Sequence, residues 1–163
     1  AFKKFIDLNK GKKIKFFMHG LAYNSDLATH ISNILKGYED YYSITGRIER
    51  QEVLKIEVKS HLLLYVAWQG YQGIIPSKIY EYIASGTPIL LAPSDKDAVE
   101  SIITQAQCGL ITYTVDDILK TLINCFNDYK NNKSIINDIN STNVQQFSRY
   151  LQTLKLKDLL DKI

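Results

Sequence analysis

A strand–helix–strand pattern in the middle of the chain constrains the fold more than any other feature. Two short apolar runs, Leu62–Ala67 and Ile89–Ala92, have the pattern of strands that are buried on both faces. Between them the sequence predicts a short helix that begins at Pro76 and Ser77 and ends at Gly86. Proline and serine favour a helix start, and glycine adopts the left-handed cap without a steric penalty. Strand, helix and strand together predict a parallel crossover unit.

The rest of the chain repeats this alternation. Further strands are predicted at Ile14–Met18, Tyr41–Thr45 and Leu110–Tyr113. Helices are predicted at Ala1–Asn9, from a cap at 24–26 to Gly37, at Glu49–Lys59, at Ala98–Gln107, at Ile118–Lys130 with 115–117 opening it, and, as a shorter segment, at Ser134–Ile139. The inner face of the second helix is predicted to carry Leu27, Ile31, Ile34 and Leu35. Residues 144–163 are expected to form closing helices. The predicted fold class is therefore α/β, a Rossmann-like three-layer domain with a mainly parallel sheet, in which residues 1–163 form a single domain.

Composition and charge exclude several classes of protein. The chain has 163 residues and a formal net charge of +3, which is too small to indicate a nucleic-acid partner. It contains no run of about 18 apolar residues, so no segment is predicted to span a membrane. Cys108 and Cys125 show no metal-ligand spacing, and two buried, reduced thiols are expected. This cysteine usage favours a cytoplasmic location.

The predicted helix at 77–86 also carries the best candidate for chemistry. It begins where a predicted parallel strand ends, which is the edge of such sheets where ligands bind. Its free amides and positive end predict an anion site, best suited to phosphate. Lys78 and Glu81 are three residues apart and therefore share one face. The loop 68–76 contains two aromatic residues, Trp68 and Tyr71. They could contact a ligand or pack over the edge of the core, and the sequence leaves both roles open.

Residues 76–90, which read Pro-Ser-Lys-Ile-Tyr-Glu-Tyr-Ile-Ala-Ser-Gly-Thr-Pro-Ile-Leu, resemble a known family. The segment is similar to the donor-binding helix of retaining GT-B glycosyltransferases of family 4, especially bacterial enzymes that build surface polysaccharides. The resemblance implies that Glu81 binds the ribose hydroxyls of a nucleotide-diphosphate sugar. It also implies that Ser77, Lys78 and Ile79 at the helix start face the diphosphate. Many members carry a second glutamate eight residues earlier, where this chain has Gly73.

Two further positions match the family near the predicted strand ends. Gly20 follows the strand at Ile14–Met18, where members often have a glycine close to the donor. Arg47 lies in the triplet 46–48, which resembles the family's turn beside the nucleobase. For Gly20 the alternative is a simple chain turn, and for Arg47 it is a solvated loop cation. Both are kept as candidate substrate-binding residues.

The implied function is the donor-binding half of a glycosyltransferase that moves a sugar to a saccharide or lipid-linked acceptor, as in capsule or O-antigen synthesis. The expected partners are the nucleotide-diphosphate sugar and an N-terminal acceptor domain of the same enzyme. The full-length enzyme is expected in the cytoplasm, with peripheral attachment to the inner face of the membrane as a further expectation. The resemblance implies no cofactor and no obligatory metal. The catalytic residues stay unassigned, and this chain alone is expected to be inactive.

The alternative is a non-catalytic α/β nucleotide-binding or regulatory module. A receiver domain needs acidic residues where the strands end, but His19, Gly46 and Trp68 stand at those ends. A sugar-nucleotide epimerase needs a Gly-x-Gly-x-x-Gly loop, which the sequence lacks. These two subclasses are therefore disfavoured, while the broader alternative stays open.

In the family, this domain starts with a strand that would come before Ala1. The resemblance therefore implies that this first strand is missing from the chain. In the usual strand order that strand lies between Ile14–Met18 and Leu62–Ala67. Leaving both facing edges buried and unpaired would cost about 1–3 kcal/mol for each unsatisfied group. We therefore expect these two strands to pair directly and give a five-stranded parallel sheet, with a swapped dimer as the competing solution.

Overall fold

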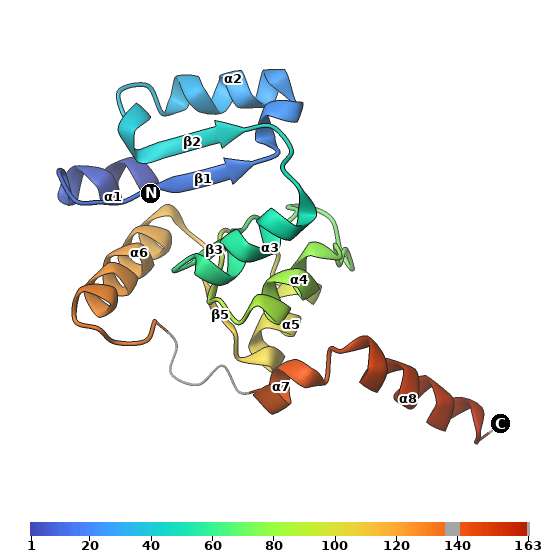
Figure 1. The fold of residues 1–163 in the computed structure, drawn as a ribbon. Helices are drawn as coiled ribbons and strands as arrows, with labels where there is room; N and C mark the ends of the chain where they lie inside the picture. Colours follow the sequence, from blue (N-terminus) through green and yellow to red (C-terminus); the bar gives the residue numbers. More distant parts are fainter. Residues whose placement is uncertain (136–140, 163) are drawn as a thin grey trace. The chain divides into compact units, whose positions relative to one another are not determined.

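The computed structural model describes residues 1–135 and 141–162 and divides the chain into two compact units (Figure 1). Unit 1 comprises Ala1–Ile56 and unit 2 comprises Glu57–Ile163. Parallel strands alternate with helices in both, so the predicted mixed α/β class is confirmed. Most of the helical segment predicted at Ser134–Ile139 lies outside the described residues.

Unit 1 is built around two parallel strands. Its elements are α1 (Phe2–Leu8), β1 (Phe16–His19), the 3₁₀ turns η1 (Leu21–Tyr23) and η2 (Glu39–Tyr41), α2 (Ser25–Ile34), β2 (Tyr42–Thr45) and the first part of α3 (Arg50–Lys59). β1 and β2 point the same way in Figure 1, with Phe16 opposite Tyr42 and His19 opposite Thr45. Both strands therefore end at the same edge of the sheet.

Helix α2 begins where its sequence predicts but buries less than expected. The side chain of Asn24 accepts a hydrogen bond of 3.0 Å from the amide of Leu27, so the predicted cap is confirmed. Leu27 and Ile34, which the sequence places on the inner face, are 43% and 48% exposed. The fully buried apolar side chains of unit 1 are Phe5, Ile6 and Leu35. Its core is therefore small.

Unit 2 contains a three-stranded parallel sheet in the order β3-β4-β5. Its elements are the end of α3, β3 (Leu63–Tyr65), α4 (Lys78–Ser85), β4 (Ile89–Leu91), α5 (Ala98–Ala106), β5 (Gly109–Ile111), α6 (Val115–Lys130), α7 (Ser141–Gln145) and α8 (Arg149–Leu160). Leu63 lies opposite Ile89, and Ile89 lies opposite Gly109. The predicted strand–helix–strand unit is therefore present as β3-α4-β4.

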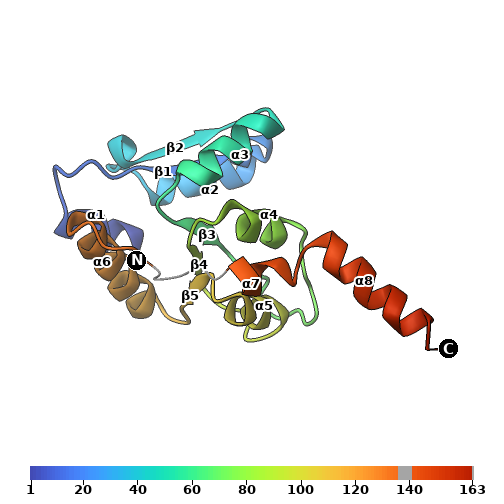
Figure 2. The same ribbon diagram turned by 60° about the horizontal axis from the view of Figure 1, so that its bottom comes forward.

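The core of unit 2 lies between this sheet and two of its helices. α4 contributes Ile79 and Ile83, while α5 contributes residues that include Val99 and Ile103. Figures 1 and 2 both show α6 on the opposite side of the sheet from α4 and α5. The middle strand β4 is therefore buried along its whole length.

Strand β3 differs from its prediction because only one of its faces is covered. Leu63 and Tyr65 are buried, whereas Leu64 is 36% exposed and Val66, just beyond the strand, is 61% exposed. The continuous apolar run predicted burial on both faces, and that prediction is wrong for this strand. Among the described residues, β3 also lies at one edge of its sheet, in the order β3-β4-β5.

Turn residues explain how several helices of unit 2 begin and end. Gly86 caps α4 with φ 71°, the left-handed conformation that the sequence predicts there. Thr114 and Asp117 form a reciprocal capping box, and α6 begins at Val115, where the sequence predicts that the helix opens. Cys108 and Cys125 are both buried and free, as expected.

The described strands form two separate sheets, β1-β2 and β3-β4-β5, so the expected direct pairing of β1 with β3 is wrong. The expectation assumed that the two open edges would be buried. Phe17 on β1 and Leu64 on β3 are instead 53% and 36% exposed. The assumption of full burial therefore does not hold for these side chains, and the assumed cost of buried unpaired groups loses its premise.

Candidate functional site

The start of α4 offers unpaired backbone amides at the carboxyl end of β3. Ser77 has helical backbone angles, and the amide of Tyr80 bonds to its carbonyl oxygen over 3.1 Å. Among the described residues, no acceptor bonds the amides of Ser77 and Lys78. Such amides, together with the helix dipole, favour an anion. The predicted phosphate site stays a prediction, for which these amides are the available donors.

Two of the predicted site residues differ in detail from expectation. The side chain of Ser77 makes no capping hydrogen bond, so its predicted capping role is wrong. The reason is that Ser77 already has helical angles, whereas a capping serine has extended ones. Ile79 is fully buried, and its amide bonds to the carbonyl of Pro76 over 3.2 Å. Ile79 therefore anchors the helix in the core rather than offering a free donor.

Lys78 joins two carboxylates. Its Nζ lies 3.1 Å from Oε2 of Glu81, which confirms that these residues share a face. It also lies 2.5 Å from Oε1 of Glu57 at the end of α3, and 5.2 Å from the ring centroid of Tyr82. One ammonium group and two carboxylates give this cluster a net charge of about −1 when all three are ionised. We call Glu57, Lys78 and Glu81 the carboxylate–lysine cluster.

The pKa values of the cluster follow from its burial and its ion pairs. Burial acts to lower the pKa of Lys78, but its hydrogen bonds to Glu57 and Glu81 outweigh burial, and the net pKa is raised. Burial also raises the pKa of the neighbouring Tyr82, with the negative charges of Glu57 and Glu81 adding to the effect and the charge of Lys78 opposing it. Lys78 therefore stays protonated, and Tyr82 stays neutral, at physiological pH.

Glu57 is the member of the cluster that sequence reasoning missed. The apolar residues of this helix are Val53, Leu54, Ile56 and Val58, but Val58 is 61% exposed and Glu57 is buried. The carbonyl oxygen of Glu57 accepts a 2.7 Å hydrogen bond from Oγ1 of Thr87. A spacing of three to four residues from Val53 and Leu54 would have placed Glu57 on the inner face. No sequence pattern indicated that Glu57 would contact Lys78, which lies 21 residues further along the chain.

The loop after β3 is held against the start of α5. The amide of Gly73 donates a 2.5 Å hydrogen bond to Oδ2 of Asp97, so a carboxylate contacts the backbone of this loop. Trp68 and Tyr71 contact each other edge to face, with centroids 6.1 Å apart, and both are more than half exposed. These aromatics therefore do not fill the core, and a ligand role for them stays a hypothesis.

The remaining predicted site residues, Gly20 and Arg47, belong to unit 1, at the carboxyl ends of its two strands. Gly20 has φ 81°, and its amide bonds to the carbonyl of Gly46 over 3.0 Å. The exposed guanidinium of Arg47 lies over the ring of Tyr23, 4.1 Å from its centroid. Gly20 thus makes a chain turn, which was the alternative to a role in substrate binding. Arg47 stacks on an aromatic ring at the surface.

Unit 1 also contains a polar pair that the sequence did not suggest. Nδ1 of His19 lies 2.9 Å from Oγ1 of Thr45, and these two residues end the two strands. Nε2 of His19 is buried and has no hydrogen-bond partner among the described residues. The pairing depends on the register of β1 with β2, which local sequence patterns do not reveal.

Comparison with known proteins gives no relative for this chain. No family model, curated protein or solved structure matches it significantly. Among the described residues, no helix has the length and apolar character needed to cross a membrane.

Proposed function

We propose that unit 2 binds the nucleotide-diphosphate sugar of a retaining glycosyltransferase, with the diphosphate at the start of α4. One observation carries the proposal: the unpaired amides of Ser77 and Lys78 stand at the start of the helix that carries Glu81 in its first turn. Amides suit the diphosphate, and a carboxylate suits the two hydroxyls of ribose. The resemblance of residues 76–90 to family 4 of the GT-B glycosyltransferases supports the same assignment.

In this proposal the chain contributes binding and charge stabilisation. As the bond between the sugar and the diphosphate breaks, negative charge grows on the leaving diphosphate. Fixed amide dipoles at the start of α4 stabilise that charge without rearrangement. Glu81 holds the nucleoside so that the diphosphate meets these amides. Transfer needs an acceptor site as well, and we assign none of its residues to this chain, so we expect the purified chain to transfer no sugar.

A binding experiment tests the proposal. Ligand-detected NMR with uridine-, guanosine- and adenosine-diphosphate sugars should identify a donor that binds the chain. Glu81→Ala should then weaken that binding about tenfold or more, since a hydrogen bond to a charged group contributes about 1.5–3 kcal/mol. Glu52→Ala is the matched control, because Glu52 is an exposed glutamate on α3. Equal affinity of the folded Glu81→Ala variant and the unchanged chain would contradict the assignment.

A further inference from the structure

Glu57 is an unusual residue in this fold because its carboxylate is buried and only partly satisfied. Its side chain is 6% exposed, compared with 40% for Lys78 and 26% for Glu81. Oε1 is bonded to Lys78, while Oε2 is buried and has no partner among the described residues. Burial of a carboxylate with an unmet acceptor is costly and is weak evidence of a stabilising role. Such a group in a native structure calls for another explanation.

The three side chains of the cluster form a path from the interior to the surface. Glu57 is fixed at its backbone by the 2.7 Å bond from Thr87 and at its carboxylate by the 2.5 Å contact with Lys78. Lys78 then reaches Oε2 of Glu81 over 3.1 Å. Exposure increases outward from Glu57 to the other two side chains. The most deeply buried member of the cluster is therefore linked, through Lys78, to the proposed ligand-binding carboxylate.

This geometry also bears on the charge of Lys78. The ammonium group is shared between two carboxylates, so its positive charge is already compensated within the cluster. A compensated cation attracts a diphosphate weakly, whereas a lysine that bridges two carboxylates restricts the rotamers of both. The arrangement therefore favours an orienting role for Lys78 over a direct ionic one.

We propose that Glu57 is a positioning residue, which holds Lys78 in place so that Lys78 orients the Glu81 carboxylate toward the two hydroxyls of a ribose. This inference rests on the proposed function. In it, the carboxylate–lysine cluster selects ribonucleotides over nucleotides that lack the two ribose hydroxyls. The diphosphate is left to the amides of Ser77 and Lys78.

The first part of the test needs no ligand. Side-chain scalar couplings of Glu81, measured by NMR, should indicate one χ1 rotamer in the unchanged chain and averaged rotamers in Glu57→Met. Glu57→Gln keeps the shape and one acceptor and should give an intermediate result. If the methionine variant does not fold, the glutamine variant carries the test. Glu52→Gln on the same helix is the control and should leave Glu81 unchanged. Unaltered couplings in both Glu57 variants would overturn the inference.

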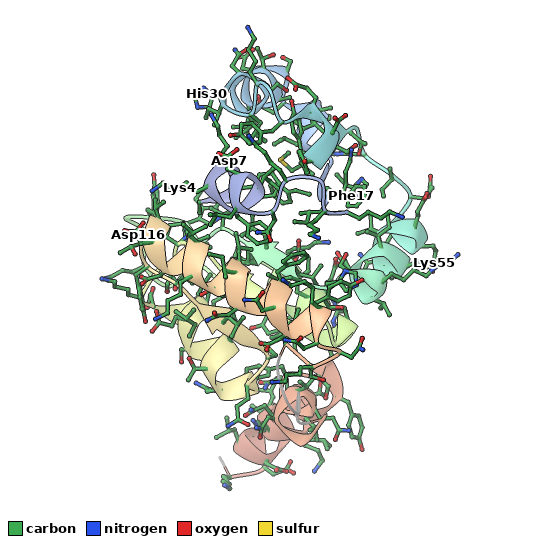
Figure 3. The ribbon with its side chains drawn as sticks, turned by 90° about the vertical axis from the view of Figure 1, so that its left-hand side faces the viewer. Lys4, Asp7, Phe17, His30, Lys55 and Asp116 are labelled. Carbon is green, nitrogen blue, oxygen red and sulfur yellow. The ribbon has the colours of Figure 1, made fainter. Side chains whose placement is uncertain are left out.

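The second part compares a nucleoside diphosphate with its 2′,3′-dideoxy analogue, using the base that binds best. Glu57→Met and Lys78→Met should each weaken the ribonucleotide about fivefold or more, in line with the loss of a well-placed hydrogen bond. Both should change the affinity of the dideoxy analogue less than about twofold, because that analogue has no hydroxyls for Glu81. Lys55→Met, an exposed lysine on α3, is the control (Figure 3).

Other outcomes separate the two claims. Equal weakening of both ligands, or a shallower salt dependence in Lys78→Met alone, would assign Lys78 to the diphosphate and overturn the positioning role. If no nucleotide binds the unchanged chain, the proposed function fails. The couplings of Glu81 then decide alone whether Glu57 positions that side chain.

Discussion

The two units contain the same kind of parallel sheet, but they bury it to very different extents. In unit 2, β4 is buried at every position and packs against Ile79 and Ile103 from two helices. In unit 1, no residue of either strand is fully buried. Because burial of apolar surface is the main stabilising term in folding, we infer that unit 2 carries most of the stability. The candidate α4 site therefore stands on the better-packed unit.

Thiol reactivity should show the largest effect, since both cysteines lie in unit 2 and are buried. Burial raises the pKa of Cys108 and of Cys125 from 9.0 to about 11. If labelling requires unit 2 to open at a cost of about 4 kcal/mol or more, alkylation should be about 10³-fold slower than in denaturant. Rapid labelling of the folded chain at pH 8 would contradict the comparison.

The same thiols give a pH dependence with a definite sign. Their folded pKa values lie above the value of 9.0 expected for the unfolded chain. Their contribution to stability is therefore fully present below pH 9 and is lost as the pH rises to about 11. Urea unfolding at a series of pH values should show this decline, and a Cys108→Ala, Cys125→Ala variant should show less of it.

A matched pair of isoleucine substitutions, one in each unit, should give the next largest difference in stability. Ile103 is 1% exposed in unit 2, and Ile34 is 48% exposed in unit 1. Ile103→Ala should lower the free energy of unfolding by about 2–5 kcal/mol, because it leaves a cavity in the core. Ile34→Ala should change it by less than about 1 kcal/mol. Chemical denaturation monitored by circular dichroism measures both variants, and similar losses in the two would break the comparison.

A pair of glycines tests packing on a finer scale. A Cβ at Gly109 would lie 2.6 Å from the carbonyl oxygen of Ile89 and 2.6 Å from a methyl carbon of Ile103. Gly109→Ala should therefore destabilise the chain by about 1–3 kcal/mol, as overpacking does. A Cβ at Gly46 would meet nothing within 4 Å, so Gly46→Ala should stay within about 0.5 kcal/mol of the unchanged chain. Thermal unfolding of the two variants compares them, and a neutral Gly109→Ala would show that this strand packs loosely.

Local features of the fold were predictable from the sequence. The ends of α4 and the parallel pair β3-β4 follow from Gly86 and from two apolar runs, because cap preferences and side-chain periodicity act over a few residues. The contact of Lys78 with Glu81 was predictable for the same reason, since the two are three residues apart on a helix. These patterns need no knowledge of distant parts of the chain.

Contacts between distant residues were not predictable in the same way. Glu57 meets Lys78 across 21 residues, and the division into two sheets depends on which strand edges meet. Sequence patterns describe which side chains are apolar but not which strands become neighbours. For Ser77, residue preference favoured a capping side chain, but the backbone there is already helical. Its contribution is therefore limited to its backbone amide.

The central claim is that a nucleotide-diphosphate sugar binds at the start of α4. Backbone amide chemical shifts, recorded by NMR during a titration with the best-binding donor, test it most directly. We expect the largest shifts at the unpaired amides of Ser77 and Lys78, with smaller shifts along α4. Saturating changes confined to Gly20, Arg47 and other residues of unit 1, with Ser77 and Lys78 unmoved, would contradict the account.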